Sequence, residues 1–229
     1  MNDRQIGFVS ACISPSRIFM QRMLNELRLL THKQQRFHPS SEMLADLEWW
    51  SVCLASYNGV SLILSEPRIN NPLRFCTDAS LHGTGGFYDG RFFHAAYRNF
   101  ITKQSLHINA LEIPAVSVSV KLWASVLPGQ RILVLTDNKS TELALNSGKS
   151  RVPFTQACLL ELWLYTARYD FEISAHYIPG SQNVIANCLS RWNLDTTYEQ
   201  QFYDTVLPWY DYITEEHCTP DLLSFECPW

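Results

Sequence analysis

Apolar residues recur at helical spacing over the first quarter of the chain. A first helix is predicted after Ser14-Pro15-Ser16, with one apolar face made of Phe19, Met23, Leu24, Leu27 and Leu30. A second helix is predicted to begin near Ser40 or Ser41 and to end at Tyr57-Asn58-Gly59, with the inward residues Leu44, Leu47, Trp50 and Leu54. Residues 1–70 are therefore predicted to form a helical segment.

The pattern changes at Leu73 to short apolar stretches separated by glycine and asparagine turns. The predicted elements are strands at 73–77, 84–88 and 91–97, a helix near 112–127, a strand at 132–136, a short helix at 140–146, a longer helix after Pro153, a strand at 171–178 and a final helix capped by Asn183. Hairpins come first and crossovers later, an order that favours a mixed sheet whose later strands are parallel. Residues 71–192 are therefore predicted to form an α/β domain.

The composition is that of a globular protein. The chain has 229 residues, of which 46% are hydrophobic and 13% aromatic, and this excludes a disordered or collagen-like chain. No apolar run reaches the roughly 18 residues of a membrane helix, and we see no hydrophobic signal segment. We therefore expect an intracellular protein of the nucleus or cytoplasm. The seven cysteines are scattered without C-x-x-C spacing, so we expect them to be reduced and expect no zinc site.

Charge is distributed unevenly along the chain. Residues 1–192 hold all 18 basic residues and 14 of the 22 acidic ones, whereas residues 193–229 hold eight acidic residues and no lysine or arginine. Residues 193–229 are therefore predicted to be an acidic C-terminal tail that can dock on a basic protein partner. Four basic residues on or just after the first predicted helix form either a solvated face or a face that follows nucleic-acid phosphates: Arg17, Arg28, Lys33 and Arg36.

Two aspartates come directly at the ends of predicted strands. The continuously apolar strand at 132–135 ends in Thr136-Asp137-Asn138, and the strand that starts at Leu73 ends in the similar Thr77-Asp78-Ala79-Ser80. An aspartate after a strand ordinarily starts a turn or caps a helix. Because open α/β sheets build their sites just beyond the strand ends, two such aspartates on neighbouring strands would converge.

Glu112 is the third candidate for this site. Asn109 and Glu112 have the spacing of a capping box, in which the glutamate would reach back to the Asn109 amide. Pro114 argues against that interpretation, because a proline at this distance removes a helical hydrogen bond. Three carboxylates held close together repel each other unless a divalent cation neutralises them, and oxygen ligands favour magnesium or manganese. A metal-dependent hydrolase is the resulting hypothesis.

Four blocks of the chain resemble, in order and spacing, the RNase H domain of a retrotransposon reverse transcriptase. They are Thr77-Asp78-Ala79-Ser80, Glu112 in a helix, Thr136-Asp137-Asn138, and the stretch HYIPGSQNVIANCLSR from His176 to Arg191. Domains of this family typically end in a motif like H-I-P-G-x-x-N-x-x-A-D-x-L-S-R. Upstream, residues 47–62 are similar to the thumb and connection region before RNase H in DIRS-type elements, and the C-terminal segment is similar to the end of their polyproteins.

The resemblance implies an RNase H-like fold, with a five-stranded mixed sheet, flanking helices and a preceding helical extension. It implies that Asp78 and Asp137 lie on adjacent strands and Glu112 on the first crossover helix, and it puts Asn187 where the family has a fourth acidic ligand. In the family these four positions are catalytic and hold two Mg²⁺ ions, with Mn²⁺ as the alternative metal. Contacts to nucleic acid are expected from the four basic residues named above and from Ser80, His82 and Asn138.

The expected function is an endoribonuclease that cuts the RNA strand of RNA-DNA hybrids by two-metal-ion hydrolysis. Asn187 is a neutral ligand that should hold its ion more weakly than an aspartate. It is compatible with impaired or manganese-favouring catalysis, with a domesticated protein that has lost catalysis, and with an engineered substitution. The alternative function is therefore a domesticated, catalytically weak or inactive RNase H-like scaffold that binds protein partners or nucleic acid. A glycosidase pair of Asp78 and Glu112 is a third interpretation, which explains neither the repeated Thr-Asp nor the terminal motif.

Overall fold

The computed structural model describes residues 23–24, 26–32, 35–56, 71–97, 108–150 and 152–223. The chain divides near residue 67 into two compact units. In the first unit, residues 23–24 and 26–27 are helical, and α3 spans Ser41–Ser56 as predicted. The Ser40 hydroxyl accepts a hydrogen bond from the Met43 amide (3.0 Å), the pattern of an N-cap. Met43, Asp46 and Trp50 form the buried face of α3 at helical spacing, whereas Leu44 and Leu47, which were predicted to point inward, are exposed.

The second unit is built on one mixed sheet with the strand order β5-β4-β1-β2-β3-β6. The strands are β1 Leu73–Ala79, β2 Gly83–Tyr88, β3 Arg91–Ala96, β4 Arg131–Thr136, β5 Glu172–Tyr177 and β6 Thr214–Glu215. β1, β2 and β3 pair antiparallel, whereas β4 pairs parallel with both β1 and β5. The predicted RNase H-like α/β fold is confirmed, with one difference: a short sixth strand, β6, is added to β3.

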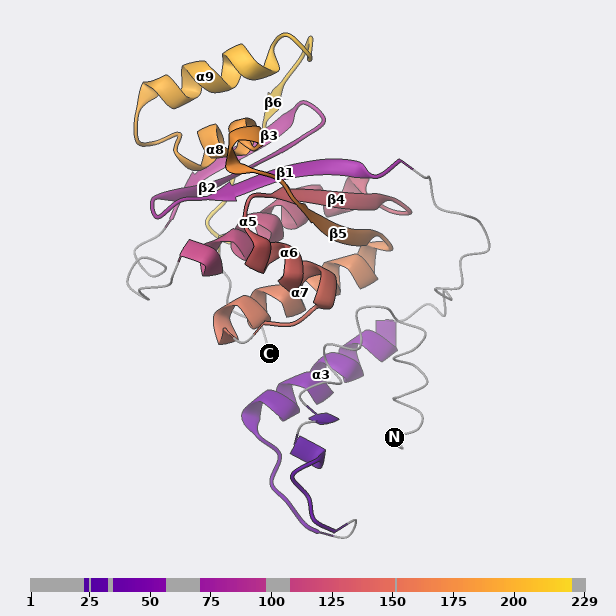
Figure 1. Ribbon diagram of the computed structural model, residues 1–229. Coiled ribbons are helices and arrows are strands. Elements are labelled where there is room, and N and C mark those ends of the chain that lie inside the picture. The colour runs from indigo at the N-terminus through magenta and orange to yellow at the C-terminus, as the bar shows by residue number, and fades with distance from the viewer. Residues whose placement is uncertain are drawn as a thin grey trace. The chain divides into compact units, whose positions relative to one another are not determined.

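Helices cover both faces of this sheet (Figure 1). On one face lie α5 Ile108–Trp123 with the short extension η1 Ala124–Val126, α6 Lys139–Ser147 and α7 Pro153–Tyr169, and on the other α8 Val184–Ser190 and α9 Thr196–Val206. The neighbours Phe92 and Phe93 of β3 are both buried, but they belong to two different core clusters. Because successive side chains of a strand point to opposite faces, the sheet is packed on both sides.

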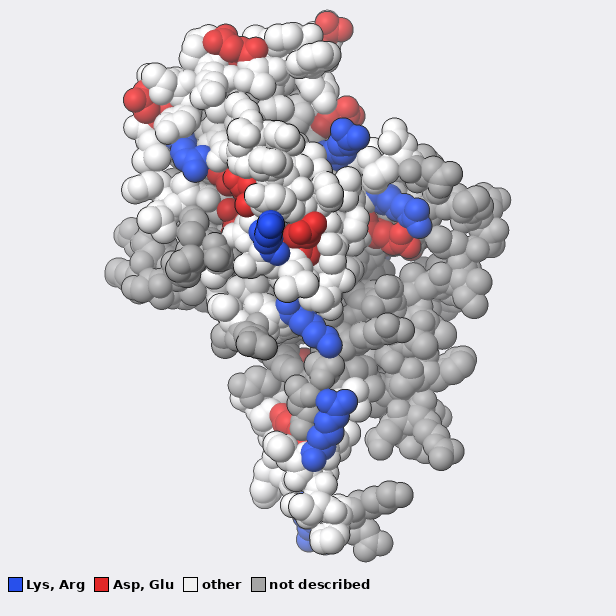
Figure 2. All heavy atoms as spheres, in the orientation of Figure 1, with Lys and Arg blue, Asp and Glu red and all other residues white. Residues whose placement is uncertain are grey.

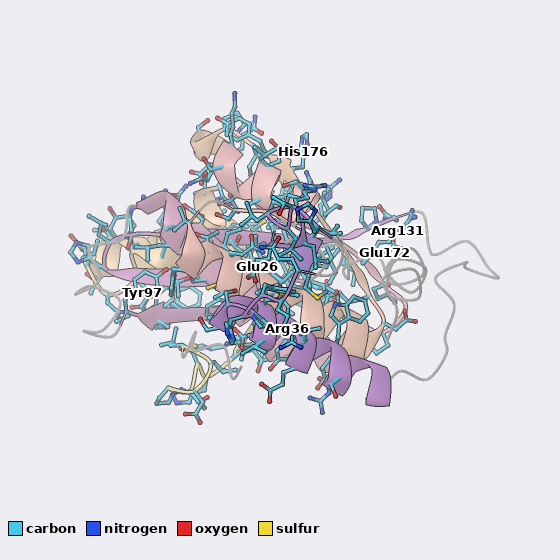
Figure 3. All side chains as sticks on the ribbon, turned by 90° about the horizontal axis from the view of Figure 1, so that it is seen from below. Glu26, Arg36, Tyr97, Arg131, Glu172 and His176 are labelled. Carbon is cyan, nitrogen blue, oxygen red and sulfur yellow. The ribbon has the colours of Figure 1, made fainter. Side chains whose placement is uncertain are left out.

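The parallel strands β4 and β5 begin side by side, at the end away from the predicted site. Their first residues, Arg131 and Glu172, are paired in the register and joined by an exposed ion pair with Nε and Oε2 3.0 Å apart (Figure 3). Exposed pairs of this kind contribute little to stability. Arg131 is therefore a suitable position for a control substitution.

Close contact with α8 explains the glycine in the middle of β2. A Cβ built on Gly85 would lie 2.3 Å from the Cβ of Leu189 and 2.7 Å from its carbonyl carbon. The helix backbone therefore rests directly on the strand at this point, and only glycine leaves room for it. This contact determines how closely the C-terminal end of α8 approaches the sheet near the end of β1.

We expect Gly85→Ala to destabilise the protein by about 3 kcal/mol, because the added methyl group overlaps backbone atoms that cannot move alone. Urea unfolding monitored by circular dichroism measures this loss. Gly129→Ala is the comparison, since its Cβ would meet nothing within 4 Å and only the positive φ of 73° opposes it. That variant should lose about 1 kcal/mol. Equal losses at both positions would contradict the close packing of α8 on β2.

No helix or strand was predicted after residue 192, but the structure has α9 and β6 there. Asp195 caps α9 by accepting a hydrogen bond from the Thr197 amide (2.9 Å), and Phe202 and Val206 bury its inner face at i, i+4 spacing. The many acidic residues around this short apolar stripe make it hard to recognise in the sequence. Within the described parts of the chain, no helix combines the length and the apolar character needed to cross a membrane.

Candidate metal centre

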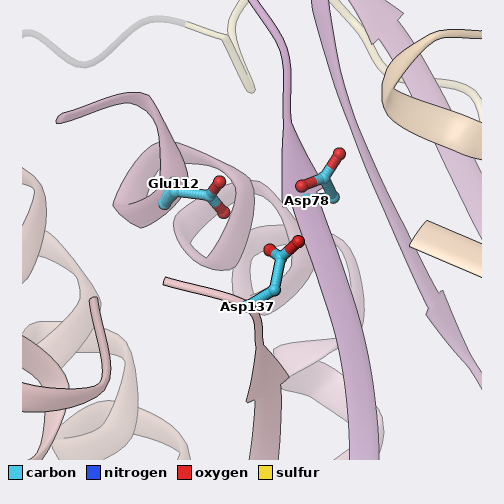
Figure 4. A group of neighbouring side chains, drawn as sticks. All are labelled: Asp78, Glu112 and Asp137. Atoms are coloured by element: carbon cyan, nitrogen blue, oxygen red, sulfur yellow. The ribbon is translucent and has the colours of Figure 1, made fainter. Parts of the chain in front are cut away.

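Parallel pairing of β1 and β4 brings the two strand-end aspartates together. Cys76 of β1 is paired with Leu135 of β4, and Asp78 and Asp137 each lie two residues further along. Glu112 comes from the second turn of α5, which lies across this end of the sheet (Figure 4). One oxygen from each of the three carboxylates lies within 4.8 Å of the others. The predicted convergence of these side chains is confirmed.

Glu112 does not form the capping box that its spacing allowed. α5 begins at Ile108, so Asn109 lies inside the first turn rather than before the helix. The Glu112 side chain points toward Asp78 and Asp137 (Figure 4), and the residue is only 4% exposed. Its Oε2 atom is buried without a hydrogen-bond partner among the described residues. An unpartnered carboxylate oxygen in this position is costly unless something positive binds to it.

The C-terminal end of α8 holds Asp78 in place. The Ser190 hydroxyl donates a hydrogen bond to Asp78 Oδ2, and Arg191 Nη1 lies 3.4 Å from the same oxygen. The Ser80 hydroxyl in turn donates to the Ser190 carbonyl (2.9 Å). Ser190 and Arg191 belong to the terminal motif of the sequence, but no role was predicted for either residue. Their Leu-Ser-Arg order was the available signal.

Without a cation, burial and mutual repulsion disfavour the charged forms of these carboxylates. Burial, followed by the charges of Asp78 and Asp137, raises the pKa of Glu112 to about 9. Burial also raises the pKa of Asp78 to about 6, although the hydrogen bond from Ser190 and the charge of Arg191 oppose the rise. At neutral pH the metal-free site therefore keeps a proton on Glu112.

The donor set fits a divalent cation. It consists of carboxylate oxygens alone, close enough to share one ion, and one of them, Glu112 Oε2, has no other partner within the described structure. A bound cation would remove both the repulsion and the unsatisfied oxygen. Asp78, Glu112 and Asp137 can therefore hold a divalent metal ion.

Asn187 lies on α8 beside this cluster, but its polar atoms are engaged within the protein. Its Nδ2 donates to the Gly180 carbonyl (3.1 Å), and its Oδ1 accepts a hydrogen bond from Arg191. Asn183 occupies the N-cap position of α8 without capping it, contrary to the prediction. Its Nδ2 instead donates to the Thr77 carbonyl (3.0 Å), which ties the start of α8 to β1.

Two of the predicted nucleic-acid contacts have structural tasks. Besides bonding Ser190, the buried Ser80 hydroxyl accepts hydrogen bonds from the His82 and Gly83 amides in the turn after β1. Asn138 is the N-cap of α6, where its side chain accepts from the Ser140 and Thr141 amides. His82 is exposed in the same turn as Ser80.

The predicted basic contacts belong to the first unit or to residues the structure leaves undescribed. Arg28 and Arg36 are exposed on the first unit, whereas Arg17 and Lys33 fall outside the described residues. On the face shown in Figure 2, described basic and acidic residues are interspersed rather than separated into patches. All of these residues stay predicted nucleic-acid contacts.

Gly180 lies close to the Asp137 side chain. A Cβ at this position would lie 2.9 Å from Asp137 Oδ2. We expect Gly180→Ala to rotate that carboxylate away, because a side-chain tip moves at little cost, and to weaken Mn²⁺ binding about tenfold. Isothermal titration measures the affinity, and the melting temperature should change little. Unchanged affinity would show that Asp137 does not hold the ion.

No family model and no curated protein matches the chain. Among solved structures, it is similar to the foamy viral protease-reverse transcriptase dRH in complex with double-stranded DNA. The two are 17% identical with a TM-score of 0.31, and the similarity covers 76% of this chain and 34% of that chain. The chain thus spans about a third of the length of that protein.

Proposed function

We propose that this protein is a metal-dependent nuclease of the RNase H type, which cuts the RNA strand of RNA-DNA hybrids and derives from a retrotransposon reverse transcriptase. The observation that carries the proposal is the meeting of Asp78, Glu112 and Asp137 at one end of the β1 and β4 pair, with Glu112 Oε2 unpartnered within the described structure. The four sequence blocks that resemble RNase H domains support it, because these three acidic residues belong to those blocks.

The three carboxylates would hold Mg²⁺, or Mn²⁺ in its place. When bound, the ion would supply a Lewis acid for the phosphate and lower the pKa of a water molecule. The protein's own part is to fix the ligands. Ser190 and Arg191 orient Asp78 from α8, and Gly180, which has no Cβ, leaves room for the Asp137 carboxylate.

The proposed substrate contacts follow the exposed residues around the site and the basic residues of the first unit. His82 is exposed in the turn after β1 and can meet a nucleic-acid backbone there. Arg28 and Arg36 are proposed to bind phosphates, together with Arg17 and Lys33. Ser80 and Asn138 are proposed to serve the substrate by shaping the turns that carry Asp78 and Asp137.

One observation favours the second candidate, a catalytically inactive scaffold. The residue at the family's fourth ligand position, Asn187, accepts a hydrogen bond from Arg191. In that case the acidic C-terminal segment is the proposed surface for a basic protein partner. Part of its charge is already used internally, since Glu216 pairs with Arg91 (3.3 Å). Glu215 Oε1 lies 3.0 Å from His94 Nε2, but burial lowers the pKa of His94, so this contact does not neutralise the glutamate at pH 7.

A cleavage assay separates the two candidates. A hybrid labelled on either the RNA or the DNA strand is incubated with the full chain in Mg²⁺ and, separately, in Mn²⁺. If the protein is a nuclease, we expect fragments of the RNA strand and an intact DNA strand. Chelation of the metal by EDTA should stop the reaction. Intact RNA in both metals would refute the nuclease and support the scaffold.

A further inference from the structure

Arg191 lies between Asp78, a member of the acidic cluster, and Asn187, which lies beside the cluster. Its Nη1 is 3.4 Å from Asp78 Oδ2, donates to Asn187 Oδ1, and lies 3.1 Å from the Asn187 carbonyl oxygen. Asp78 is 4% exposed at its side chain and Arg191 34% exposed. The guanidinium therefore joins a buried carboxylate to a partly solvent-exposed position.

The oxygens on this side of Asp78 already have donors. Asp78 Oδ2 accepts from both Ser190 and Arg191, and Asn187 Oδ1 accepts from Arg191. The Asn187 amide is held in this orientation, because its Nδ2 donates to Gly180. On the other side of the cluster Glu112 Oε2 has no partner among the described residues. The structure thus offers oxygens to a cation on the Glu112 side and N–H groups on the Asn187 side.

Charge balance points the same way. Asp78, Glu112 and Asp137 contribute three negative charges when ionised, and Arg191 contributes one positive charge. A guanidinium stays protonated in proteins and has only donors, so it cannot act as a metal ligand. The remaining charge is balanced by one divalent cation. An aspartate at position 187 would add a negative charge and an anionic ligand, which the neutral Asn187 lacks.

We propose that the Arg191 guanidinium stands in for a second divalent cation, so that the site holds a single metal ion and Arg191 supplies the other positive charge to the scissile phosphate. The inference rests on the proposed nuclease function and names the cations that serve it. Arginine is suited to this task, since its planar fork can donate two parallel hydrogen bonds to a phosphate.

Counting bound Mn²⁺ on the full chain tests the proposal. Isothermal titration, with electron paramagnetic resonance to measure free Mn²⁺, gives the number of ions per chain. We expect one ion for the unaltered protein and one for Asn187→Asp, because Arg191 still fills the place beside Asp78. The double variant Asn187→Asp with Arg191→Gln should bind two. Arg131→Gln, in the exposed pair with Glu172, is the matched control and should bind one.

The outcomes test the role of Arg191 separately from the proposed nuclease function. Two ions in the unaltered protein or in Asn187→Asp, or a single ion in the folded double variant, overturn the role of Arg191 and leave the nuclease proposal standing. No bound Mn²⁺ in the unaltered protein overturns the metal-dependent function itself. If circular dichroism shows that the double variant is unfolded, the variant Arg191→Lys with Asn187→Asp decides. Lysine keeps the positive charge but lacks the planar fork of the guanidinium. Because that charge remains, a second ion should bind at least tenfold more weakly than the first. A lysine variant that binds two ions equally well would refute the proposal.

Discussion

Asp137→Asn is expected to lower the rate of hybrid cleavage by about 10³-fold or more while leaving the protein folded. The substitution keeps the shape of the side chain but replaces a charged oxygen ligand with a neutral amide in a cluster whose ligand oxygens lie within 4.8 Å of one another. Both the affinity for the cation and the field at the phosphate fall together. Single-turnover rates with saturating enzyme, in Mg²⁺ and in Mn²⁺, measure the effect on the chemical step.

Asp204→Asn is the matched control for this experiment. Asp204 lies on the exposed side of α9 and accepts a hydrogen bond from Gln200 (2.9 Å), away from the acidic cluster. The Asp204→Asn variant should cleave the hybrid at the same rate as the unaltered protein. Cleavage by Asp137→Asn at more than a tenth of the normal rate would show that the three carboxylates are not the active centre.

Without metal, Glu112→Gln is expected to raise the free energy of unfolding by about 3 kcal/mol at pH 7. The pKa of Glu112 in the folded protein is about 9, against an ordinary value of 4.5, so the folded state keeps a proton that the unfolded chain has released. The folded protein therefore loses stability as the pH rises from about 4.5 through 9. Glutamine mimics the protonated acid and removes this loss.

Urea unfolding in EDTA at pH 4.5, 7 and 9 measures this difference. The variant and the unaltered protein should be nearly equal at pH 4.5 and should diverge as the pH rises. Asp78, whose pKa is raised to about 6, adds a smaller loss of the same sign between about pH 4 and 6 in both proteins. Added Mn²⁺ should stabilise the unaltered protein at pH 7 and have little effect on Glu112→Gln. Parallel pH profiles for the two proteins would contradict the buried, mutually repelling arrangement.

The positions of the two aspartates were predictable because they follow from strand direction. Once β1 and β4 are parallel neighbours, Asp78 and Asp137 must reach the same edge of the sheet, and the repeated Thr-Asp marked both strand ends in the sequence. Glu112 was predictable for a different reason, since Pro114 weighed against the local capping role that its spacing offered.

The contacts made by α8 were not predictable in the same way. They depend on how closely the helix rests on Gly85, which is a property of packing between elements far apart in the chain. The family resemblance implied Asn187 as a metal ligand, and only the structure shows the hydrogen bond that its oxygen accepts from Arg191. α9 and β6 were missed because the acidic residues of the C-terminal segment suggested a solvated tail, although Phe202 and Val206 give it a buried side.

β6 has a consequence for how this protein meets other chains. Its backbone bonds to β3, with the Thr214 amide donating to Gly90 (2.8 Å) and the Glu216 amide to Phe92 (2.7 Å). The outer rim of β3 is the place where a foreign peptide would otherwise attach by strand addition, or where copies would stack into aggregates. The chain's own C-terminal segment pairs with the first residues of β3 and so prevents strand addition at this edge. Proteolytic loss of the segment would expose the edge of β3.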